Sequence, residues 1–314
     1  MRGVKLSVVA TMYRSAGYVR EFHQRASEAA QAITDDYEIV LVNDGSPDDS
    51  LAAAIELHRT DPRVVVVDLS RNFGHHRAMM AGLRHARGEL VFLIDIDLEE
   101  DPAELIRFHE RLQKGDCDVV YGVQAIRRGH IGERISGELF YWLISKLGGV
   151  SIPRNLTTVR LMTRRYVDNL IRHEERDVVI SGLWMLTGFE QAALTVEKTE
   201  RRARSNYHIG RKVRLALDYV TSFSATPLYF AFNAGLALSI ASSVICAFFI
   251  IRYLITQDAL AGWTSLMASI WMFGGISVLL IGFIGIYVAR IFEETKRRPY
   301  MIVRHLYRTD ADYD

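Results

Sequence analysis

The sequence has few of the features that mark several common classes of protein. Only two of its 314 residues are cysteines, Cys117 and Cys246, which excludes a disulfide framework of the kind found in small secreted domains. Because only Cys246 lies in a long apolar run, we expect no bridge between them, which suits a reducing cytosol. The apolar stretch at 6–10 is too short for a signal peptide, so we expect no cleaved leader.

The sequence also lacks a surplus of charge. It contains 38 Lys and Arg residues against 37 Asp and Glu residues, a formal net charge of +1, which argues against a nucleic-acid partner. Neither a Gly-x-Gly-x-x-Gly segment after the first expected strand nor a Gly-x-x-x-x-Gly-Lys-Ser/Thr segment is present. These absences disfavour a dinucleotide-binding Rossmann site and exclude a P-loop nucleotide site.

Two long runs contain no charged residue, Tyr219–Ile251 and Ala259–Ala289. Each exceeds the roughly 20 apolar residues that cross a bilayer core. We therefore expect two transmembrane helices, at about 228–254 and 265–289. The alternative, a buried helical hairpin in a soluble core, is disfavoured because charge-free runs of this length are rare in soluble helices.

Basic residues flank both runs, whereas the loop 256–262 holds one acid and no base. Arg252, near the outer end of the first span, is the one dissonant charge, and its side chain can snorkel to the interface. By the positive-inside rule, both chain ends lie in the cytoplasm and the loop lies outside. We expect a cytosolic domain at 1–208, a juxtamembrane amphipathic helix at 209–226, the spans within 227–290 and a cytosolic basic tail at 291–314. The flanking cations are Arg201, Arg202, Arg204, Arg211, Lys212 and Arg214 before the first run, and Arg290, Lys296, Arg297, Arg298 and Arg304 after the second.

The first 120 residues alternate short apolar runs with amphipathic stretches. Strands are expected at 6–10, 38–42, 64–68, 90–94 and 118–122, and helices at 18–33, 49–59, 75–86 and 103–113. The first four strands are almost continuously apolar, as in parallel sheets that are covered on both faces. The alternation predicts an α/β fold with a doubly wound, mostly parallel sheet and right-handed crossovers.

Ligands of such sheets bind at the carboxyl ends of the strands. One of these ends reads Asp95-Ile96-Asp97. Residues i and i+2 of an extended segment point the same way, so both carboxylates can converge on Mg²⁺ or Mn²⁺. Such an ion bridges the phosphates of a sugar nucleotide and stabilises the departing diphosphate. The alternative is an acidic strand end that only caps the next helix.

A second strand end reads Asn43-Asp44-Gly45-Ser46. Asp44 is placed to accept the N–H of a pyrimidine base, and Gly45 allows the backbone to approach a ligand. The alternative is an Asp-Gly turn, which is common on its own.

Several segments together carry a resemblance to a known family. In order and spacing, Ser7-Val8-Val9, Val42–Ser46, Ser70–His75 and Asp95–Leu98 resemble family 2 glycosyltransferases of the GT-A fold. The similarity continues through Tyr121-Gly122-Val123, Phe140-Tyr141, Arg160-Leu161-Met162 and Thr221–Ser224 into the two apolar runs. It is strongest for the polyprenyl-phosphate glycosyltransferase branch, which includes dolichyl-phosphate mannose synthase and the bacterial GtrB-type proteins.

The resemblance implies an inverting, metal-dependent transferase of the bacterial inner membrane. It would move one sugar from a nucleoside-diphosphate sugar, with a UDP-sugar favoured, to polyprenyl (undecaprenyl) phosphate at the cytoplasmic face, for modification of cell-envelope glycans. The donor-binding residues implied are Thr11, Tyr13, Asp44, Asn72, Asp95, Ile96 and Asp97; Asp95 and Asp97 would hold Mg²⁺ or Mn²⁺ and, with Arg160, form the catalytic set.

The sequence departs from the family pattern at two places. It reads Thr11–Ser15 where relatives usually read Pro-x-Tyr-Asn-Glu, and Thr158 where many relatives have an acidic residue that has been considered a catalytic base. A phosphomonoester has a second pKa of about 6, so it is already ionised at pH 7 and needs little proton abstraction. The threonine therefore favours a lipid phosphate over an alcohol as the acceptor.

Guanidinium groups suit phosphate recognition. The candidates for holding the acceptor phosphate are Arg127, Arg128, Arg134, Arg204 and Arg211. The first three follow the fifth strand, where an ordinary basic surface is the alternative. The last two precede the first apolar run, where attraction to anionic lipid headgroups is the alternative.

The same residues bear on other functions. A processive polysaccharide synthase would carry Gln-x-x-Arg-Trp before its spans, and this chain does not. A membrane-anchored sugar-nucleotide-binding or regulatory protein with reduced catalysis, and a transferase with a non-phosphate acceptor, stay as alternatives. Glycines in the second run, such as Gly282 and Gly285, permit close helix approach, which is typical of self-associating spans.

Overall fold

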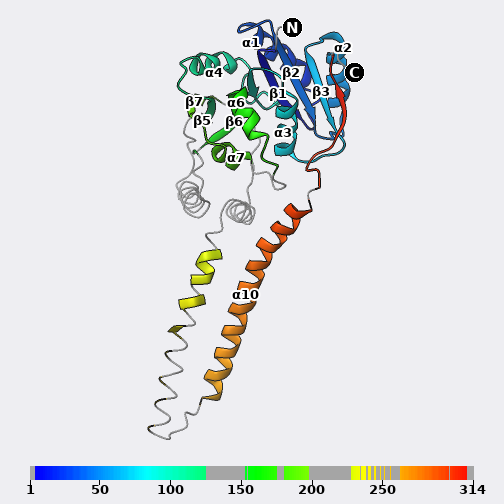
Figure 1. Cartoon of the computed structure of the whole chain (residues 1–314). Helices are drawn as coiled ribbons and strands as arrows, with labels where there is room; N and C mark the ends of the chain where they lie inside the picture. Colours follow the sequence, from blue (N-terminus) through cyan, green and yellow to red (C-terminus); the bar gives the residue numbers. More distant parts are fainter. Residues whose placement is uncertain are drawn as a thin grey trace. The chain divides into compact units, whose positions relative to one another are not determined.

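The computed structural model describes residues 4–124, 153, 155–174, 180–197, 262–296 and 298–309, with isolated helical residues between 228 and 255. The chain divides into two compact units (Figure 1). The first comprises Met1–Trp142, Val150–His208 and Arg298–Asp314. The second comprises Leu143–Gly149 and Ile209–Arg297.

The first unit is built on one eight-stranded sheet with the order β7-β5-β6-β4-β1-β2-β3-β8. Strands β3, β2, β1 and β4 are parallel, β6 is antiparallel to β4 and β5, β7 is parallel to β5, and β8 is antiparallel to β3. The predicted α/β class with a mostly parallel sheet is therefore confirmed. The strands are β1 (Leu6–Met12), β2 (Tyr37–Asn43), β3 (Val64–Leu69), β4 (Leu90–Leu93), β5 (Val119–Gln124), β6 (Leu156–Thr163), β7 (Gln191–Val196) and β8 (Val303–Tyr307).

Helices cover both faces of the parallel strands. They are α1 (Val19–Gln31), α2 (Ser50–Thr60), α3 (His75–His85) and α4 (Glu104–Leu112), with the short α6 (Arg164–Leu170) and α7 (Ile180–Leu186) further along. Helix α1 contacts α2 and α4, so these three share a layer, while α3 packs on β1 and β2. A Cβ atom at Gly82 would lie 2.4 Å from a methyl group of Val9, so the missing side chain allows α3 to approach the sheet closely.

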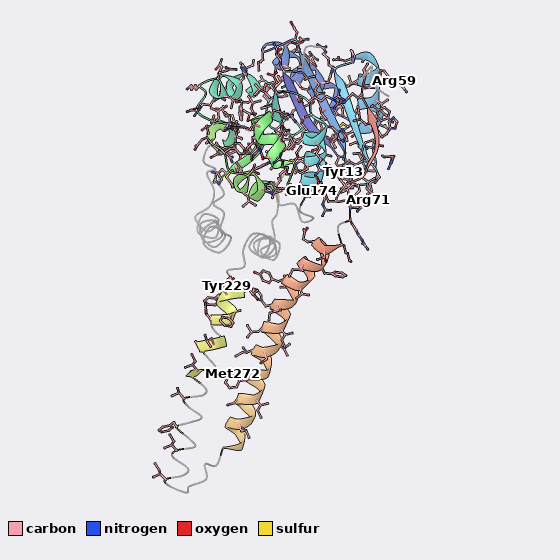
Figure 2. All side chains as sticks on the ribbon, in the orientation of Figure 1. Tyr13, Arg59, Arg71, Glu174, Tyr229 and Met272 are labelled. Atoms are coloured by element: carbon pink, nitrogen blue, oxygen red, sulfur yellow. The ribbon has the colours of Figure 1, made fainter. Side chains whose placement is uncertain are left out.

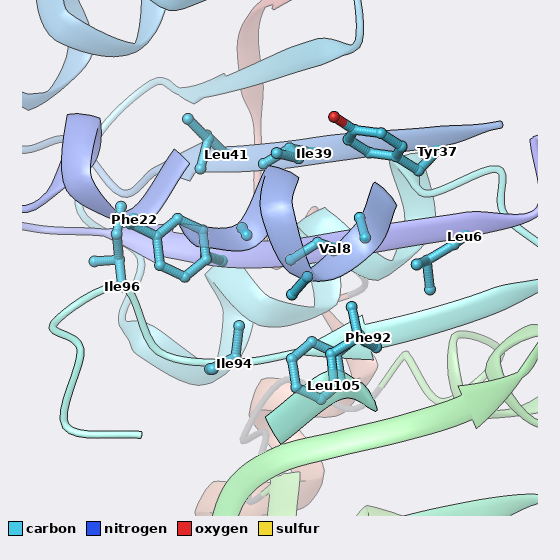
Figure 3. Close-up of a cluster of buried hydrophobic side chains, with 14 of the residues drawn as sticks. Leu6, Val8, Phe22, Tyr37, Ile39, Leu41, Phe92, Ile94, Ile96 and Leu105 are labelled. Atoms are coloured by element: carbon cyan, nitrogen blue, oxygen red, sulfur yellow. The ribbon is translucent and has the colours of Figure 1, made fainter. Parts of the chain in front are cut away.

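The core lies between the sheet and the layer of α1 and α4 (Figure 3). Every residue of β1 and β2 is buried, as expected from their continuous apolar sequences. Alternate residues such as Leu6 and Val8 contact the same cluster as Phe22 of α1, and Phe92 of β4 meets Phe108 of α4 edge to face at 5.7 Å between ring centroids. This packing fixes the strand ends, which are where the polar residues lie.

Three strands, β6, β7 and β8, were not predicted from the sequence. Strand β6 separates β4 from β5, so the fifth predicted strand does not pair with the fourth. Strand β8 comes from the segment that we expected to be a basic tail, and it forms the edge of the sheet beside β3 (Figure 1). Both pairings join residues that are distant in the sequence, and periodicity alone does not reveal them.

The second unit contains a long apolar helix, α10 (Trp263–Thr295). Its segment Met272–Ala289 has a mean hydropathy of 2.2, and none of it is buried. Among the described residues, α10 is the one helix that is both long enough and apolar enough to cross a membrane. It covers much of the second predicted span. About half of the first predicted span, and the whole predicted juxtamembrane helix up to residue 226, lie outside the described residues. The hairpin therefore stays a prediction.

Candidate active site

A cavity of about 330 Å³ opens at the carboxyl ends of the parallel strands. It is lined by Thr11, Met12, Tyr13, Ser15, Asp44, Asn72, Gly74, His75, Asp95, Ile96 and Asp97. All of the residues predicted to bind the donor are in this set. The chain runs from β1 to β2 and β3 on one side and then returns to β4 on the other side of β1. The cavity therefore lies where the strand order reverses, the usual ligand position in such sheets.

Left-handed backbone conformations occur in each loop around the cavity. Positive φ angles are found at Arg14 (56°), Gly45 (59°), Gly74 (97°) and Leu98 (60°). A Cβ atom at Gly45 would lie 2.4 Å from the amide nitrogen of Asn72, so only glycine allows the loops after β2 and β3 to touch. For Arg14 and Leu98 the conformation is strained, and such strain concentrates at binding sites.

Asp44, a residue that is 3% exposed, links the same two loops through its carboxylate. One oxygen accepts a hydrogen bond from Phe73 N at 2.7 Å, and the other accepts from Gly74 N at 3.1 Å. Burial raises the pKa of Asp44, while these two hydrogen bonds act in the opposite direction. Each carboxylate oxygen keeps a second lone pair, so Asp44 can also accept an N–H from a ligand base.

Tyr13 presents an aromatic surface at the cavity, with 46% of the residue exposed. Figure 2 shows Tyr13 and Arg71 at the same end of the first unit. The backbone of Tyr13 is fixed by Ser15, whose hydroxyl accepts from Tyr13 N and donates to Tyr13 O, both at 3.2 Å. A large exposed aromatic side chain on a fixed backbone at a cavity is suited to stacking on a nucleotide base.

Asp95 and Asp97 both line the cavity, whereas Ile96 between them is 3% exposed. Asp97 accepts a hydrogen bond from Glu99 N at 3.0 Å, which orients its carboxylate. Two carboxylates at one strand end are a donor set that Mg²⁺ and Mn²⁺ accept. Within the described part of the chain, no three His, Cys, Asp or Glu side chains gather as a complete metal site. Such an ion would therefore take its remaining ligands from phosphate oxygens and water.

His75 is a cavity residue that the sequence places at the start of a helix near the donor phosphates, but that is not in the predicted set of site residues. Its Nδ1 lies 3.1 Å from the hydroxyl of Thr11, and its Nε2 lies 3.3 Å from a carboxylate oxygen of Asp95. Burial alone would lower the pKa of His75, but the hydrogen bond and charge of Asp95, with the charges of Asp44 and Asp97, raise it. Its position after Asn72-Phe73-Gly74 at the start of a helix was the available signal. Met12, Ser15 and Gly74 were also missed.

Arg160, predicted to be catalytic, does not line the cavity. It lies on β6 opposite Leu93 of β4 and is fully buried. Its guanidinium packs over the ring of Trp184, and its Nε donates to Thr158 O at 3.3 Å. Burial lowers the pKa of Arg160 to about 9. No acidic side chain of the described residues forms an ion pair with it, so its part in catalysis stays a prediction.

Of the remaining residues singled out from the sequence for catalysis or acceptor binding, the structure describes only Thr158. Thr158 lies on β6, half-buried, and is not among the residues that line the cavity. The predicted acceptor-phosphate residues, Arg127, Arg128, Arg134, Arg204 and Arg211, lie outside the described residues.

Comparison with known sequences identifies the family. The signature described as glycosyl transferase family 2 matches residues 7–173, which include every residue that lines the cavity. The chain belongs to glycosyl transferase family 2. The resemblance noted from the sequence is thereby confirmed, and the eight-stranded mixed sheet is the GT-A-like fold expected of a family 2 glycosyltransferase.

Relatives match this glycosyltransferase over nearly its whole length. A glycosyltransferase of Mycobacterium tuberculosis is 48% identical, over 98% of this chain and 90% of the relative. The prophage bactoprenol glucosyl transferase homolog of Escherichia coli K12 is 33% identical, over 96% of this chain and 99% of the relative. Among solved structures, a mannosyltransferase from Pyrobaculum calidifontis in complex with GDP-Man and Mn²⁺ is 17% identical and covers 82% of each chain, with a TM-score of 0.48.

Proposed function

We propose that this family 2 glycosyltransferase moves one sugar, with inversion, from a nucleoside-diphosphate donor to polyprenyl phosphate at the cytoplasmic face of the bacterial inner membrane. A UDP-sugar is the favoured donor, and the lipid-linked product would serve cell-envelope glycan modification. The observation that carries the proposal is the cavity in which Tyr13, Asp44, Asp95 and Asp97 converge. The cavity combines an aromatic ring on which a base can stack, a carboxylate that can accept a base N–H, and two carboxylates for a diphosphate-bound cation.

Five of the cavity residues have tasks in this reaction. Tyr13 stacks on the base, and Asp44 accepts its N–H, which fixes the donor at the β1 and β2 ends of the cavity. Asp95 and Asp97 would hold Mg²⁺ or Mn²⁺, and such an ion would supply positive charge beside the departing diphosphate. His75 holds the carboxylate of Asp95 from the side of Thr11. The acceptor phosphate oxygen attacks the anomeric carbon from the face opposite the diphosphate.

A lipid acceptor is supported by two observations outside the cavity. The relatives named bactoprenol glucosyl transferases match over 96% or more of this chain. The apolar segment Met272–Ala289 of α10 would hold the enzyme at a bilayer, where a polyprenyl chain resides. The same names make glucose the first sugar to test.

The decisive test is transfer by the purified full-length protein in detergent. It is incubated with undecaprenyl phosphate, Mg²⁺ or Mn²⁺ and each of UDP-glucose, UDP-galactose, UDP-N-acetylglucosamine and GDP-mannose. We expect one UDP-sugar to give a lipid-linked hexose by mass spectrometry. Absence of lipid-linked product with every donor, from protein whose folding is verified by its thermal transition, would refute the proposal.

Asp44→Ala ties that activity to the cavity. The variant loses the acceptor for the base N–H and the two backbone hydrogen bonds that join the loops. Loss of one hydrogen bond to a charged group costs about 1.5–3 kcal/mol, so we expect the apparent KM for the donor to rise at least about tenfold. Initial rates over a range of donor concentrations measure this change. An unchanged KM would place the base elsewhere.

The membrane orientation can be tested separately. In a background that lacks Cys117 and Cys246, a cysteine at Gly262, the residue before α10, should react with an impermeant thiol reagent added outside intact cells. A reporter fused after residue 314 should be active in the cytoplasm. Labelling of Gly262→Cys only after the cells are opened would contradict the proposed orientation and the cytosolic donor together.

A further inference from the structure

The strand β8 follows the apolar helix α10 in the chain and joins the sheet beside β3. Its pairing has an irregularity: Asp68 lies opposite His305, and the next residue, Leu69, lies opposite Val303. Arg304 is therefore the extra residue of a β-bulge. A bulge redirects the side chain of the inserted residue, and bulges are frequent next to active sites.

The redirected side chain of Arg304 makes two contacts with the end of β3. Its Nη1 lies 3.5 Å from a carboxylate oxygen of Asp68, and its Nη2 donates to Ser70 O at 2.5 Å. The amide of Ser70 in turn donates to Ile302 O at 2.9 Å. Both peptide groups of Ser70 are thus fixed by the segment around β8. Ser70 is the first residue of the loop that carries Asn72 and Gly74 to the cavity.

The second contact continues into the other loop of the cavity. The side chain of Asp68 is 3% exposed, and its other oxygen accepts from Asn43 Nδ2 at 2.8 Å. The amide oxygen of Asn43 accepts from Ser46 N at 3.2 Å, which closes the turn that holds Asp44 and Gly45. A continuous line of hydrogen bonds and one ion pair therefore runs from Arg304 to the loop after β2.

The two loops then meet again at the cavity itself. Asp44 accepts from Phe73 N and Gly74 N, and Gly45 lies against the backbone of residues 71 and 72. Arg304 acts on both loops next to the strand ends from which they start, whereas Asp44 joins the loops where they line the cavity. The side chain of Arg304 is 57% exposed, so this cation is not part of the buried core.

We propose that Arg304 is a positioning residue for the donor cavity: it fixes the loops after β2 and β3 through Asp68 and Ser70. The inference rests on the proposed use of a nucleoside-diphosphate donor in that cavity. It gives the segment after the membrane helix a function in donor binding, beyond the topological role assigned to its positive charge.

Arg308 provides a matched control on the same segment. It forms an ion pair with Glu38 at 3.5 Å and donates to His85 O, at the start of β2 and the end of α3. These contacts lie at the opposite end of the strands from the cavity. Arg308 is also the more buried of the two arginines, with a side chain 7% exposed, so its loss should disturb the sheet edge at least as much.

The experiment compares Arg304→Ala, Arg304→Lys and Arg308→Ala in the full-length protein in detergent. Calorimetric titration gives the Kd for UDP, hydrogen exchange reports on the amides of residues 70–74, and a thermal scan gives the Tm. We expect Arg304→Ala to weaken UDP binding about tenfold and to speed exchange at Phe73 and Gly74. Arg304→Lys should recover part of the affinity, because a lysine can pair with Asp68 without forking to Ser70. Arg308→Ala should lower the Tm and leave the Kd within about twofold.

The outcomes separate this inference from the proposed function. If the wild-type protein binds UDP and Arg304→Ala binds it equally well, the positioning role is refuted and the donor assignment stands. Equal weakening by Arg304→Ala and Arg308→Ala would also refute it, because a general loss of stability then explains both. If the wild-type protein binds no nucleotide, the donor assignment fails. Faster exchange at Phe73 and Gly74 in Arg304→Ala alone would still support the contact between β8 and the loops, and equal exchange in both variants would overturn it.

Discussion

Asp97→Asn should abolish sugar transfer while the protein stays folded. The carboxamide keeps an oxygen that can accept from Glu99 N, so the loop after β4 retains its hydrogen bond. It removes one of the two anionic ligands offered to the cation, which weakens both cation binding and neutralisation of the departing diphosphate. We expect a fall in kcat/KM of at least about 1,000-fold, which corresponds to ~4 kcal/mol of transition-state stabilisation. Initial rates with saturating polyprenyl phosphate measure it.

Asp101→Asn is the matched control for this experiment. Asp101 is an exposed acid on the same loop whose carboxylate accepts from Ala103 N and lies 3.5 Å from Arg25, and it does not line the cavity. This substitution removes the same charge nearby, so activity should stay within about twofold, as expected for an exposed pair. Titration of Mn²⁺ in the presence of UDP should show binding to the control and weaker binding to Asp97→Asn. Full activity of the wild-type enzyme in excess EDTA would contradict the metal assignment.

The sequence predicts the first half of the fold well because its signals are local. The strands that became β1, β2, β3 and β4 are runs of apolar residues bounded by turns, and each ends in the polar residues that line the cavity. Once the strands are parallel, their carboxyl ends must lie at one edge, so the meeting of Tyr13, Asp44 and Asp97 follows from topology. The family resemblance supplied their expected roles, which spacing alone leaves open.

The parts that were missed depend on contacts between distant segments. His75 was seen as the start of a helix, but its position between Thr11 and Asp95 follows from how α3 packs on β1. Strand β8 is a short segment in a charged tail, and only the free edge of β3 makes it a strand. Arg304 carries two signals at once, because a cation near a membrane helix predicts orientation whatever else it binds. Periodicity and charge counting detect the positive charge that predicts orientation, but they do not detect the contacts of Arg304 with Asp68 and Ser70.

Thr158 bears on the chemical nature of the acceptor. The family resemblance leads one to expect an acid at this position, whereas this chain has a threonine on β6, two residues before the buried Arg160. It can supply a hydrogen bond but not a base at neutral pH. A phosphate acceptor is already ionised above its second pKa of about 6, so the reaction needs no base there. Thr158→Val should therefore lower the rate by at most about tenfold, the loss expected from one modest hydrogen bond.

Polyprenyl phosphate should react at least about 1,000 times faster than polyprenol at matched concentration, because an alcohol needs a general base that contributes about 10²–10⁴-fold. With the phosphate, the rate should not rise above about pH 7, and it should fall as the acceptor is protonated below about pH 6. The transfer rate falls at low pH because the dianion of the acceptor is the nucleophile, and protonation removes it. Thr158→Val should show the same pH profile as the wild-type enzyme, since neither side chain titrates in this range. Turnover of polyprenol at a comparable rate, or a rate that rises with pH well above 7, would instead indicate an alcohol acceptor and a base elsewhere in the chain.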